Sequence, residues 1–395
     1  MTTFADLSLH VVGEEGLLLD SSHRKLYALN ASAAFIWSLL KDGQSPAEAS
    51  RSLSAHFAIP ADEAATYVAD VLRQYGVSSD APVPNTPLPT TPVTNTRRRL
   101  ERSRAGPIET YALLESAFRV HYDSTRLAEQ IHPLLQHGAL KNGARRNGTK
   151  LANVVDVAVV PANVPGSDGV VIVTDEKEIG SSRTLEDAAV AVRACLTQLA
   201  VTTSGGLCVV HAGALCRDGA ALLLPGEAGH GKSTLSAGLA ARGFAMLCDD
   251  TTLLAGEPAL VRCLPTGLCI KRGAYPVLER DYPRLLALPE WRRPDGRHAR
   301  YLMPGRDLPW AAPGAAVAVR WIVFPRYHPD HGTALLPLPK HEALGRLLPG
   351  VCFLSGALDK QNLDRLIAWI ETIDCFELPL SSLDAATPLI DGLCI

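Results

Sequence analysis

The stretch ALLLPGEAGHGKSTLSAGL, residues 221–239, decides the fold, because Gly226, Gly231, Lys232 and Ser233 satisfy the pattern G-x-x-x-x-G-K-[ST]. An apolar run at 221–224 precedes the glycines and predicts a buried strand, and the helix-forming residues 233–242 follow them. Glycines let backbone N–H groups converge on an anion, and the dipole of the helix favours negative charge at its N-terminus. The stretch therefore predicts an α/β fold with a phosphate site after one strand.

This loop also predicts the ligands of a nucleotide. We expect Lys232 to reach the outer phosphates and the Ser233 hydroxyl to coordinate Mg²⁺. The expected cofactors are therefore ATP and Mg²⁺, with the preference between ATP and GTP left open. The expected nucleotide-binding residues are Gly226, Glu227, Ala228, Gly229, His230, Gly231, Lys232, Ser233 and Thr234.

Two further signals flank the loop. A predicted strand at 244–248 ends in Asp249 and Asp250, and two adjacent carboxylates can divide metal binding from proton acceptance, although such a pair is also common in solvated turns. His211 ends the apolar run LCVV, where a lone histidine is usually a core residue. Because the C-terminal ends of strands in such sheets gather the ligands, we expect His211, Lys232 and both aspartates to converge there.

This constellation resembles the HPr kinase/phosphorylase family, whose core is related to phosphoenolpyruvate carboxykinase. The similarity extends through LPTGLCIKRGAYPVL (264–278), IVFPRYHP (322–329), LPLPKHEALGRLL (336–348) and FELPLSSLDAA (376–386). The resemblance implies that Lys232 and Ser233 bind phosphate and metal. It also implies that Asp249 and Asp250 supply metal ligation and the general base, and that His211 orients or tunes that base.

The chain departs from the family pattern at three positions. Thr234 stands where the family usually has an acidic residue, and Lys271 and Arg272 replace the family's E-x-R-G type of signature. Lys271 and Arg272 could neutralise charge on the transferred phosphoryl group, or be surface cations. No segment matches the part of the family linked to phosphorolysis, so the sequence leaves open whether the reverse reaction occurs and whether HPr is a substrate.

The N-terminal residues 1–77 predict a separate module of three strands followed by three helices, which is a winged-helix arrangement. The strands are expected near Leu9, Leu17 and Lys25, and Ser45 with Glu48 has the spacing of a helix capping box. The segments LNASAAFIWSLLKDGQSPAEASRSLSAHF (29–57) and VADVLRQYGV (68–77) resemble the PqqD family of peptide chaperones, also called the RiPP recognition element. The resemblance implies that a leader peptide adds a strand at residues 25–29 and packs beside a helix at 62–75.

Charge argues against nucleic-acid binding. The module carries five Lys or Arg against nine Asp or Glu, a net charge of −4, and the whole chain has a formal net charge of −3. A DNA-binding winged helix would present a basic face, so peptide binding is favoured over DNA. No apolar run is long enough to span a membrane, no secretory signal is visible, and nine cysteines without a CxxC pair indicate reduced thiols, so we expect a cytoplasmic protein.

These observations predict an α/β (α+β) multidomain chain in four parts. They are a PqqD-like peptide-binding domain at 1–77, a proline-rich linker at 78–107, an N-terminal part of the kinase region at 108–200 without assigned chemistry, and an HPr kinase-like catalytic domain at 201–395. An arginine cluster at 97–104 closes the linker and reads as a solvated end or as a docking site for an acidic peptide.

The two resemblances together predict a kinase that phosphorylates a Ser or Thr hydroxyl of a ribosomally made precursor peptide. The tethered module would raise the concentration of the peptide's reactive end near the nucleotide. Two alternatives stay open: a nucleotide-binding peptide chaperone without phosphotransfer, and a small-molecule kinase whose N-terminal module only docks partners. Other peptide-maturation enzymes are possible partners, and self-association is possible by analogy with HPr kinase.

Overall fold

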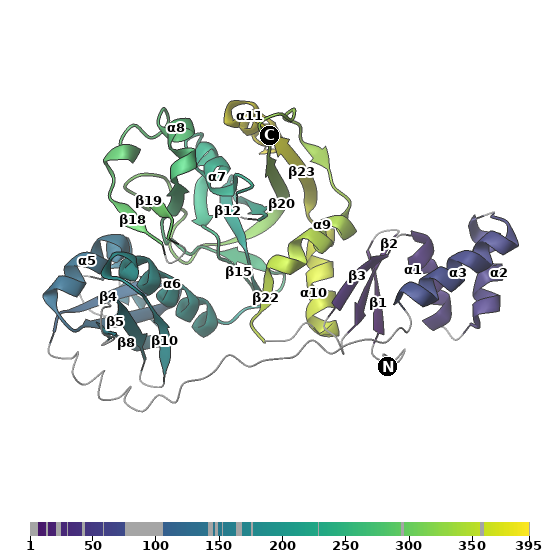
Figure 1. The fold of residues 1–395 in the computed structure, drawn as a ribbon, viewed down its shortest axis with the longest axis horizontal. Helices are drawn as coiled ribbons and strands as arrows, with labels where there is room; N and C mark the ends of the chain where they lie inside the picture. Colours follow the sequence, from purple (N-terminus) through teal and green to yellow (C-terminus); the bar gives the residue numbers. More distant parts are fainter. Residues whose placement is uncertain are drawn as a thin grey trace. The chain divides into compact units, whose positions relative to one another are not determined.

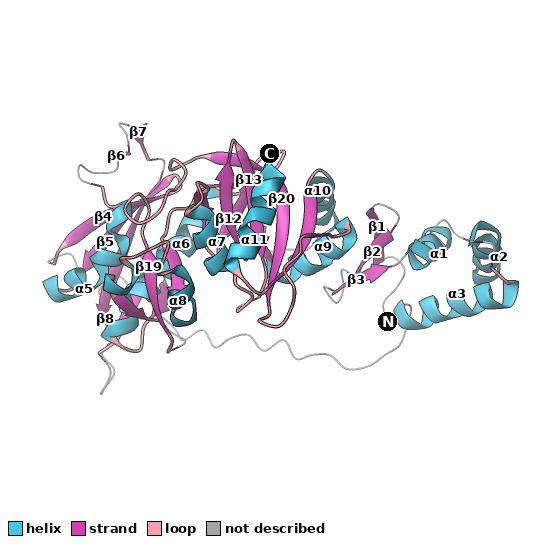
Figure 2. Cartoon of the chain, turned by 90° about the horizontal axis from the view of Figure 1, so that it is seen from above, coloured by secondary structure: helices cyan, strands magenta, loops and turns pink. Residues whose placement is uncertain are grey.

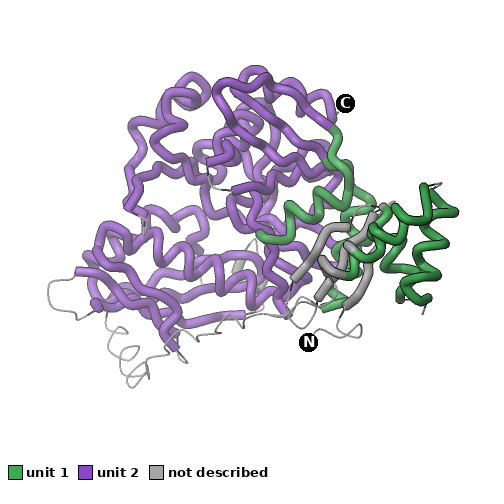
Figure 3. The backbone as a smooth tube through the Cα atoms, turned by 45° about the vertical axis from the view of Figure 1, so that its right-hand side comes forward, with its two compact units in different colours: residues 1–90, 337–349, 356–375 green, residues 91–336, 350–355, 376–395 purple. Residues whose placement is uncertain are grey.

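The computed structural model describes most of the chain, in two compact units (Figure 3). Unit 1 comprises residues 1–90, 337–349 and 356–375, and unit 2 comprises residues 91–336, 350–355 and 376–395, each within its described parts. The described residues are 7–12, 15–20, 25–29, 31–41, 44–57, 59–75, 106–140, 145–146, 149–151, 153–162, 168–174, 177–227, 229–293, 296–355 and 359–394. The predicted linker at 78–107 lies outside them except for Gly106 and Pro107.

Unit 1 begins with an antiparallel sheet in the order β1-β2-β3, followed by three helices. The helices bury Ile36, Trp37, Leu53 and Val68 in one small core, as their spacing along the sequence requires. The strand β3 lies at one edge of the sheet and pairs only with β2 among the described residues. The elements are β1 (Leu7–Val12), β2 (Glu15–Asp20), β3 (Lys25–Leu29), α1 (Ala31–Lys41), α2 (Pro46–Phe57) and α3 (Ala61–Tyr75).

The start of α2 has the predicted capping box. The Glu48 carboxylate accepts from the Ser45 backbone N–H at 2.8 Å, and the Glu48 N–H donates to the Ser45 hydroxyl at 3.3 Å. These bonds satisfy donors that the first turn of a helix otherwise leaves free. The sequence prediction for this helix start is confirmed.

Unit 1 also contains two helices from far along the chain, α9 (Lys340–Leu347) and α10 (Lys360–Glu371). Within the unit, α9 lies against β2 and β3, and α10 lies against β1. Both helices are amphipathic, with Leu344, Leu347, Leu366 and Ile370 among their buried residues. The sequence alone placed these residues in the catalytic domain, because nothing in their local pattern indicates a partner some 300 residues earlier; the predicted four-part division remains a prediction.

Unit 2 begins with a five-stranded sheet in the order β10-β9-β8-β5-β4, against which α5 and α6 pack (Figures 1 and 2). The apolar runs at 118–122, 154–160 and 170–173 lie in strands of this sheet, and residues 185–199 lie in a helix. The elements are β4 (Ile108–Leu113), β5 (Ser116–Tyr122), α5 (Thr125–Leu135), β8 (Asn153–Pro161), β9 (Val170–Val173), β10 (Glu178–Ser181) and α6 (Leu185–Ser204).

The larger sheet of unit 2 carries the predicted phosphate-binding loop. Its order is β14-β12-β13-β20-β16-β15-β11-β22, with β23 beside β20. Only the β13–β20 pair is parallel among the pairings described for this path, so the sheet is mostly antiparallel. The strands are β11 (Cys208–Val210), β12 (Ala212–Arg217), β13 (Ala220–Pro225), β14 (Ala245–Cys248), β15 (Thr252–Ala255), β16 (Leu260–Arg262), β20 (Ala316–Tyr327), β22 (Val351–Phe353) and β23 (Asp374–Leu380).

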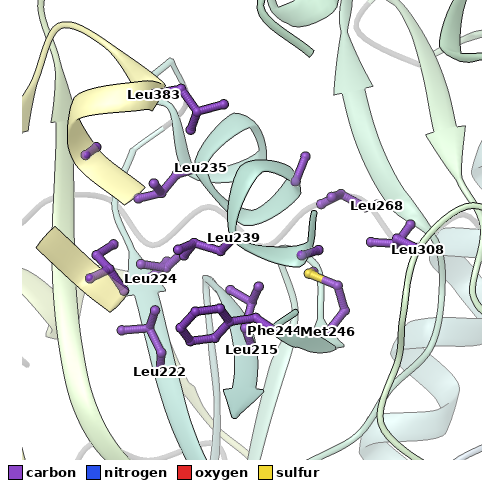
Figure 4. Packing of buried hydrophobic residues seen from close by; sticks show 14 of the residues in the cluster. Leu215, Leu222, Leu224, Leu235, Leu239, Phe244, Met246, Leu268, Leu308 and Leu383 are labelled. Atoms are coloured by element: carbon purple, nitrogen blue, oxygen red, sulfur yellow. The ribbon is translucent and has the colours of Figure 1, made fainter. Parts of the chain in front are cut away.

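The core beside this sheet fixes the helix that follows the loop. Leu235 and Leu239 of α7 (Lys232–Ala240) pack among Leu222, Leu224 and Phe244 (Figure 4). Leu383 of α11 (Leu383–Asp391) joins the same cluster. A small antiparallel sheet, β17 (Leu268–Lys271), β19 (His298–Leu302) and β18 (Glu290–Arg292), and the short α8 (Tyr275–Leu278) complete the surroundings of the loop.

The chain is thus a mixed α/β protein in more than one unit, as predicted. None of the helices in the described part of the chain combines the length and apolar character that crossing a bilayer requires.

Candidate functional site

The site is built around the turn from β13 to α7. Gly229 and Gly231 have φ values of 96° and 87°, a region that favours glycine because other residues meet steric strain there. Gly231 is the N-cap of α7, and no side chain caps this helix start. The N–H groups of the first turn are therefore available to an external acceptor, which is the arrangement that binds phosphate at a helix N-terminus.

Lys232 lies at the first position of α7 and is buried, with 6% of its surface exposed. Its Nζ donates to the backbone carbonyls of Gly226 and of Glu227, the latter at 3.1 Å. Burial lowers the pKa of Lys232, and the nearby Asp250 opposes that effect. The ammonium group is therefore held inside the loop, where an anion would compensate for its lost hydration.

His211 links the lysine to the aspartate pair. Its Nδ1 lies 3.0 Å from the backbone carbonyl oxygen of Asp250, and a carbonyl can only accept, so Nδ1 carries the proton. This tautomer leaves Nε2 as an acceptor, 3.4 Å from the Lys232 Nζ. The backbone N–H of His211 donates to the Gly350 carbonyl at 2.7 Å. His211 therefore orients the backbone of Asp250 and the head of Lys232, and its described bonds reach neither carboxylate.

The two aspartates follow β14 and differ in environment. Asp249 is 6% exposed, and its Oδ2 accepts from the Cys269 backbone N–H at 2.9 Å. Burial, and then the negative charge of Asp250, raise the pKa of Asp249 to about 7. Asp250 has a φ of 56°, which is strained for a residue with a side chain. The Asp249 side chain is thus largely buried, whereas Asp250 lines the cavity described next.

A cavity of about 750 Å³ opens beside the loop. One wall is the start of α7 with Lys232 and Ser233, and Asp250 and Lys271 lie on the wall formed by the ends of β14 and β17. The cavity therefore brings together a helix N-terminus, two ammonium groups, a hydroxyl and a carboxylate. Its lining residues are Glu227, Gly229, Gly231, Lys232, Ser233, Thr234, Leu235, Asp250, Cys269, Ile270, Lys271, Gly273, Ala274, Pro276, Val277, Arg280, Tyr327, Leu380, Ser381, Ser382, Leu383 and Asp384.

Not every predicted site residue lies on this wall. His211 and Asp249 lie behind it, bonded to its members, and Gly226 and His230 belong to the loop without lining the cavity. Arg272 turns away, because its guanidinium forms two bonds to the Glu290 carboxylate at 3.0 and 2.5 Å. Ala228 lies outside the described residues.

His211 reaches the predicted site through a strand pairing that the sequence did not indicate. His211 lies between β11 and β12, and it reaches the site because Ala212 at the start of the antiparallel β12 pairs with Pro225 at the end of β13. The beginning of one strand, and not only the ends of others, thus forms this edge. The expectation based on the C-terminal ends of strands missed this hairpin, which has no signal of its own beside the loop motif.

The far half of the cavity is formed by residues that the sequence did not predict for the site. Tyr327 is half exposed at the end of β20, and Ser381 and Ser382 come just before α11. Arg280 donates to the Asp384 carboxylate at 2.6 Å and closes this end. These residues lie in segments that the family resemblance covers, but hydroxyls and single aromatics have no spacing that would identify them.

Mg²⁺ and a nucleotide fit the groups present. A Ser233 hydroxyl and an Asp250 carboxylate are hard oxygen donors, and Mg²⁺ is commonly held by one or two protein carboxylates together with phosphate oxygens. No cluster of three or more His, Cys, Asp or Glu side chains forms a metal cage among the residues that the structure describes. A metal at this site would therefore share its coordination shell with the phosphate ligand.

Residues 15–75 match the family model of Coenzyme PQQ synthesis protein D (PqqD), which confirms the predicted resemblance of the N-terminal module. Similar solved structures include TbiB1 in complex with the TbiA(beta) leader peptide, which is 24% identical, with a TM-score of 0.18, over 19% of this chain and 86% of that chain. They also include the Hpr(Ser) kinase/phosphatase from Coxiella burnetii, 16% identical with a TM-score of 0.23 over 47% of this chain and 93% of that chain. No curated protein matches the chain.

Proposed function

We propose that this chain is an ATP- and Mg²⁺-dependent kinase that transfers the γ-phosphate to a Ser or Thr hydroxyl of a ribosomally synthesised precursor peptide. The observation that supports this most is the cavity in which the start of α7, Lys232 and Ser233 face Asp250 and Lys271. The same chain carries a PqqD region at residues 15–75. A phosphate site and a peptide-binding region in one polypeptide are the two parts that such a kinase requires.

The catalytic residues would act as follows. The N–H groups of the first turn of α7 and the Lys232 ammonium hold the phosphates, and Ser233 and Asp250 hold Mg²⁺. Bound Mg²⁺ supplies charge neutralisation of the transferred group. We assign the general base to Asp249, whose pKa is raised by burial and by the neighbouring Asp250; this role requires its carboxylate to come within hydrogen-bond reach of the acceptor hydroxyl when the peptide is bound.

The bonds balance as in any phosphoryl transfer. A bond forms between the acceptor oxygen and the γ-phosphorus, and the bond from that phosphorus to the β–γ bridging oxygen breaks. The electron pair of the broken bond leaves on ADP, and Lys271 on the cavity wall is placed to offset the charge.

The peptide would bind at the N-terminal module. The edge strand β3 can receive an added strand, and the exposed face of α3 presents Asp62, Ala65, Thr66 and Ala69 one helical turn apart. Small side chains at Ala65 and Ala69 leave room for a peptide to lie along the helix. The leader would thereby keep the acceptor residue of the same peptide near the nucleotide.

The test is transfer of label from [γ-³²P]ATP to a precursor-like peptide encoded by a neighbouring reading frame. We expect Mg²⁺-dependent labelling by the wild type and its loss in Lys232→Met, with Lys360→Met as the matched control because Lys360 is an exposed lysine of α10. ADP formation without a labelled peptide would instead indicate a nucleotide-driven chaperone. Labelling of a free metabolite in place of the peptide would indicate a small-molecule kinase.

A further inference from the structure

The small sheet domain at residues 106–204 contributes one charged side chain to the region of the site. Arg193 lies on α6, and its Nη1 donates to the backbone carbonyl of Thr266 at 3.2 Å. Its Cζ lies 4.9 Å from the centre of the Tyr301 ring, within the range of a cation–π interaction. The Arg193 guanidinium therefore contacts residues in or beside β17 and β19, which lie outside residues 106–204.

The environment of this guanidinium is unusual for a surface contact. Its Nε is almost completely shielded from solvent and has no hydrogen-bond partner among the described residues, although Arg193 as a whole is partly exposed. The carboxylates that interact with it electrostatically are those of Asp249 and Asp250. A cation that is partly shielded from water is stabilised by nearby negative charge, and the aspartate pair supplies such charge here beside the Tyr301 ring.

A second connection runs through the backbone. Thr266 stands two residues before β17, and Cys269 of that strand donates its N–H to the Asp249 carboxylate. The bond from Arg193 to Thr266 therefore fixes the start of the strand that orients Asp249. Arg193 is therefore connected to the Asp249 carboxylate both electrostatically and through the backbone of residues 266–269.

We propose that Arg193 is a positioning residue of the phosphotransfer site, which supplies counter-charge to Asp249 and Asp250 and fixes the strand that holds Asp249. This inference rests on the proposed function, and it gives residues 106–204 a role in catalysis. In this role, residues 106–204 supply the Arg193 guanidinium from outside the sheet that carries the loop.

Other contacts across the same contact surface provide a matched control. The Arg262 guanidinium pairs with the Glu115 carboxylate, and His137 Nε2 lies 2.7 Å from the Pro265 carbonyl. These bonds also join residues 106–204 to the rest of unit 2, but the carboxylates at 249 and 250 are not their partners. Arg262→Gln therefore loosens the same contact without removing charge from the aspartates.

The experiment compares Arg193→Gln, Arg193→Lys and Arg262→Gln in the full-length protein. We expect Arg193→Gln to lower kcat for phosphopeptide formation roughly 10- to 100-fold, as loss of a supporting partner does at metal sites, while Arg193→Lys keeps most of the activity. Arg262→Gln should keep kcat near the wild-type value even if it lowers the Tm as much as Arg193→Gln does.

A second readout is independent of turnover: the Mg²⁺ concentration that half-saturates ADP uptake, measured by calorimetry at pH 8. Arg193→Gln should need several-fold less Mg²⁺, because a nearby positive charge repels the cation. A requirement for more Mg²⁺ would overturn the counter-charge role of Arg193, as would equal kcat values for the Gln and Lys variants. Failure of the wild type to take up Mg²⁺ and ADP would refute the proposed function itself.

Should Arg193→Gln not fold, Arg193→Lys still decides the matter through its kcat. A value close to that of the wild type, with Mg²⁺ dependence unchanged, supports the charge role. A loss as large as that of a Lys232→Met variant, at wild-type Tm, contradicts it.

Discussion

At the scale of single residues, the two adjacent aspartates show how position in the fold separates chemically identical groups. Asp250 lines the cavity and has a strained backbone. Asp249 is largely buried, and its carboxylate accepts a hydrogen bond from the Cys269 N–H. The sequence left open which aspartate holds the metal and which accepts a proton. Burial, which no sequence pattern around DD specifies, suggests the division proposed above.

Substitution of each aspartate should therefore have a different effect. Asp250→Asn should weaken Mg²⁺-dependent ADP uptake by roughly tenfold or more, since it removes a ligand oxygen charge. Asp249→Asn should leave uptake within a few-fold and lower phosphotransfer by about 10²-fold or more. Calorimetry and label transfer measure the two effects, with Asp364→Asn on the exposed face of α10 as the control. The reverse pattern would exchange the two roles.

A second prediction concerns pH and a residue far from the cavity. Asp156 of β8 accepts from the Arg119 guanidinium at 2.6 Å and from His121 Nε2 at 2.6 Å. The Arg119 bonds hold the pKa of Asp156 at about 2, below its ordinary value of 3.8. A lowered pKa stabilises the fold above the ordinary value, and this stability is lost as the pH falls from about 4 towards 2.

Asp156→Asn removes the titrating group. The midpoint of urea unfolding should therefore fall less between pH 4.5 and pH 3 in the variant than in the wild type, and the variant should be the less stable protein at pH 7. Parallel pH dependences of the two proteins would show that this ion pair does not contribute.

At the scale of elements, α7 and α11 meet so closely that one position decides their spacing. A Cβ added at Gly238 of α7 would lie 2.6 Å from Leu383 Cδ1 of α11, well inside contact distance. Leu383 also lines the cavity, so this packing sets the distance between the phosphate-binding helix and the far wall. Helix propensity alone would favour alanine at 238, and tertiary packing opposes it.

The two effects can be separated by a double-mutant cycle. Gly238→Ala should lower the free energy of unfolding by about 1–3 kcal/mol through overpacking. In a Leu383→Ala background the same change should be neutral or stabilise by up to about 1 kcal/mol, because the obstacle is gone and helix propensity remains. Chemical denaturation of the four proteins gives the coupling, and additive effects would mean that α11 moves away at no cost.

At the scale of the whole molecule, peptide capture and nucleotide chemistry should be separable by point changes. Ala65→Arg on the exposed face of α3 should weaken leader-peptide binding roughly tenfold or more, because the peptide must pack against a large charged group. ADP uptake should be unchanged. Fluorescence anisotropy with a labelled leader peptide measures the loss, and Ala47→Arg on the exposed side of α2 is the matched control.

Local patterns of the sequence predicted much of this architecture, and long-range pairing accounts for what they missed. The strand, loop and helix at 221–242 and the capping box at Ser45 are encoded within a few residues, so both were found. The antiparallel hairpin that brings His211 to the loop, the cavity wall at 380–384 and the approach of Arg193 all depend on partners far away in the chain. The resemblance to HPr kinases named His211 and the aspartates, but not their bonds.

The inclusion of α9 and α10 in unit 1 affects how this chain can change in evolution. Recombination at the proline-rich stretch would exchange strands β1–β3 but leave behind the two helices that lie against them. The exchanged strands would then pack against apolar faces of α9 and α10 that fit the original strands, and the hybrid protein would tend to aggregate. Exchanging the N-terminal module between relatives would therefore require transplanting residues 337–375 along with it, so the module and these two helices are expected to diversify together.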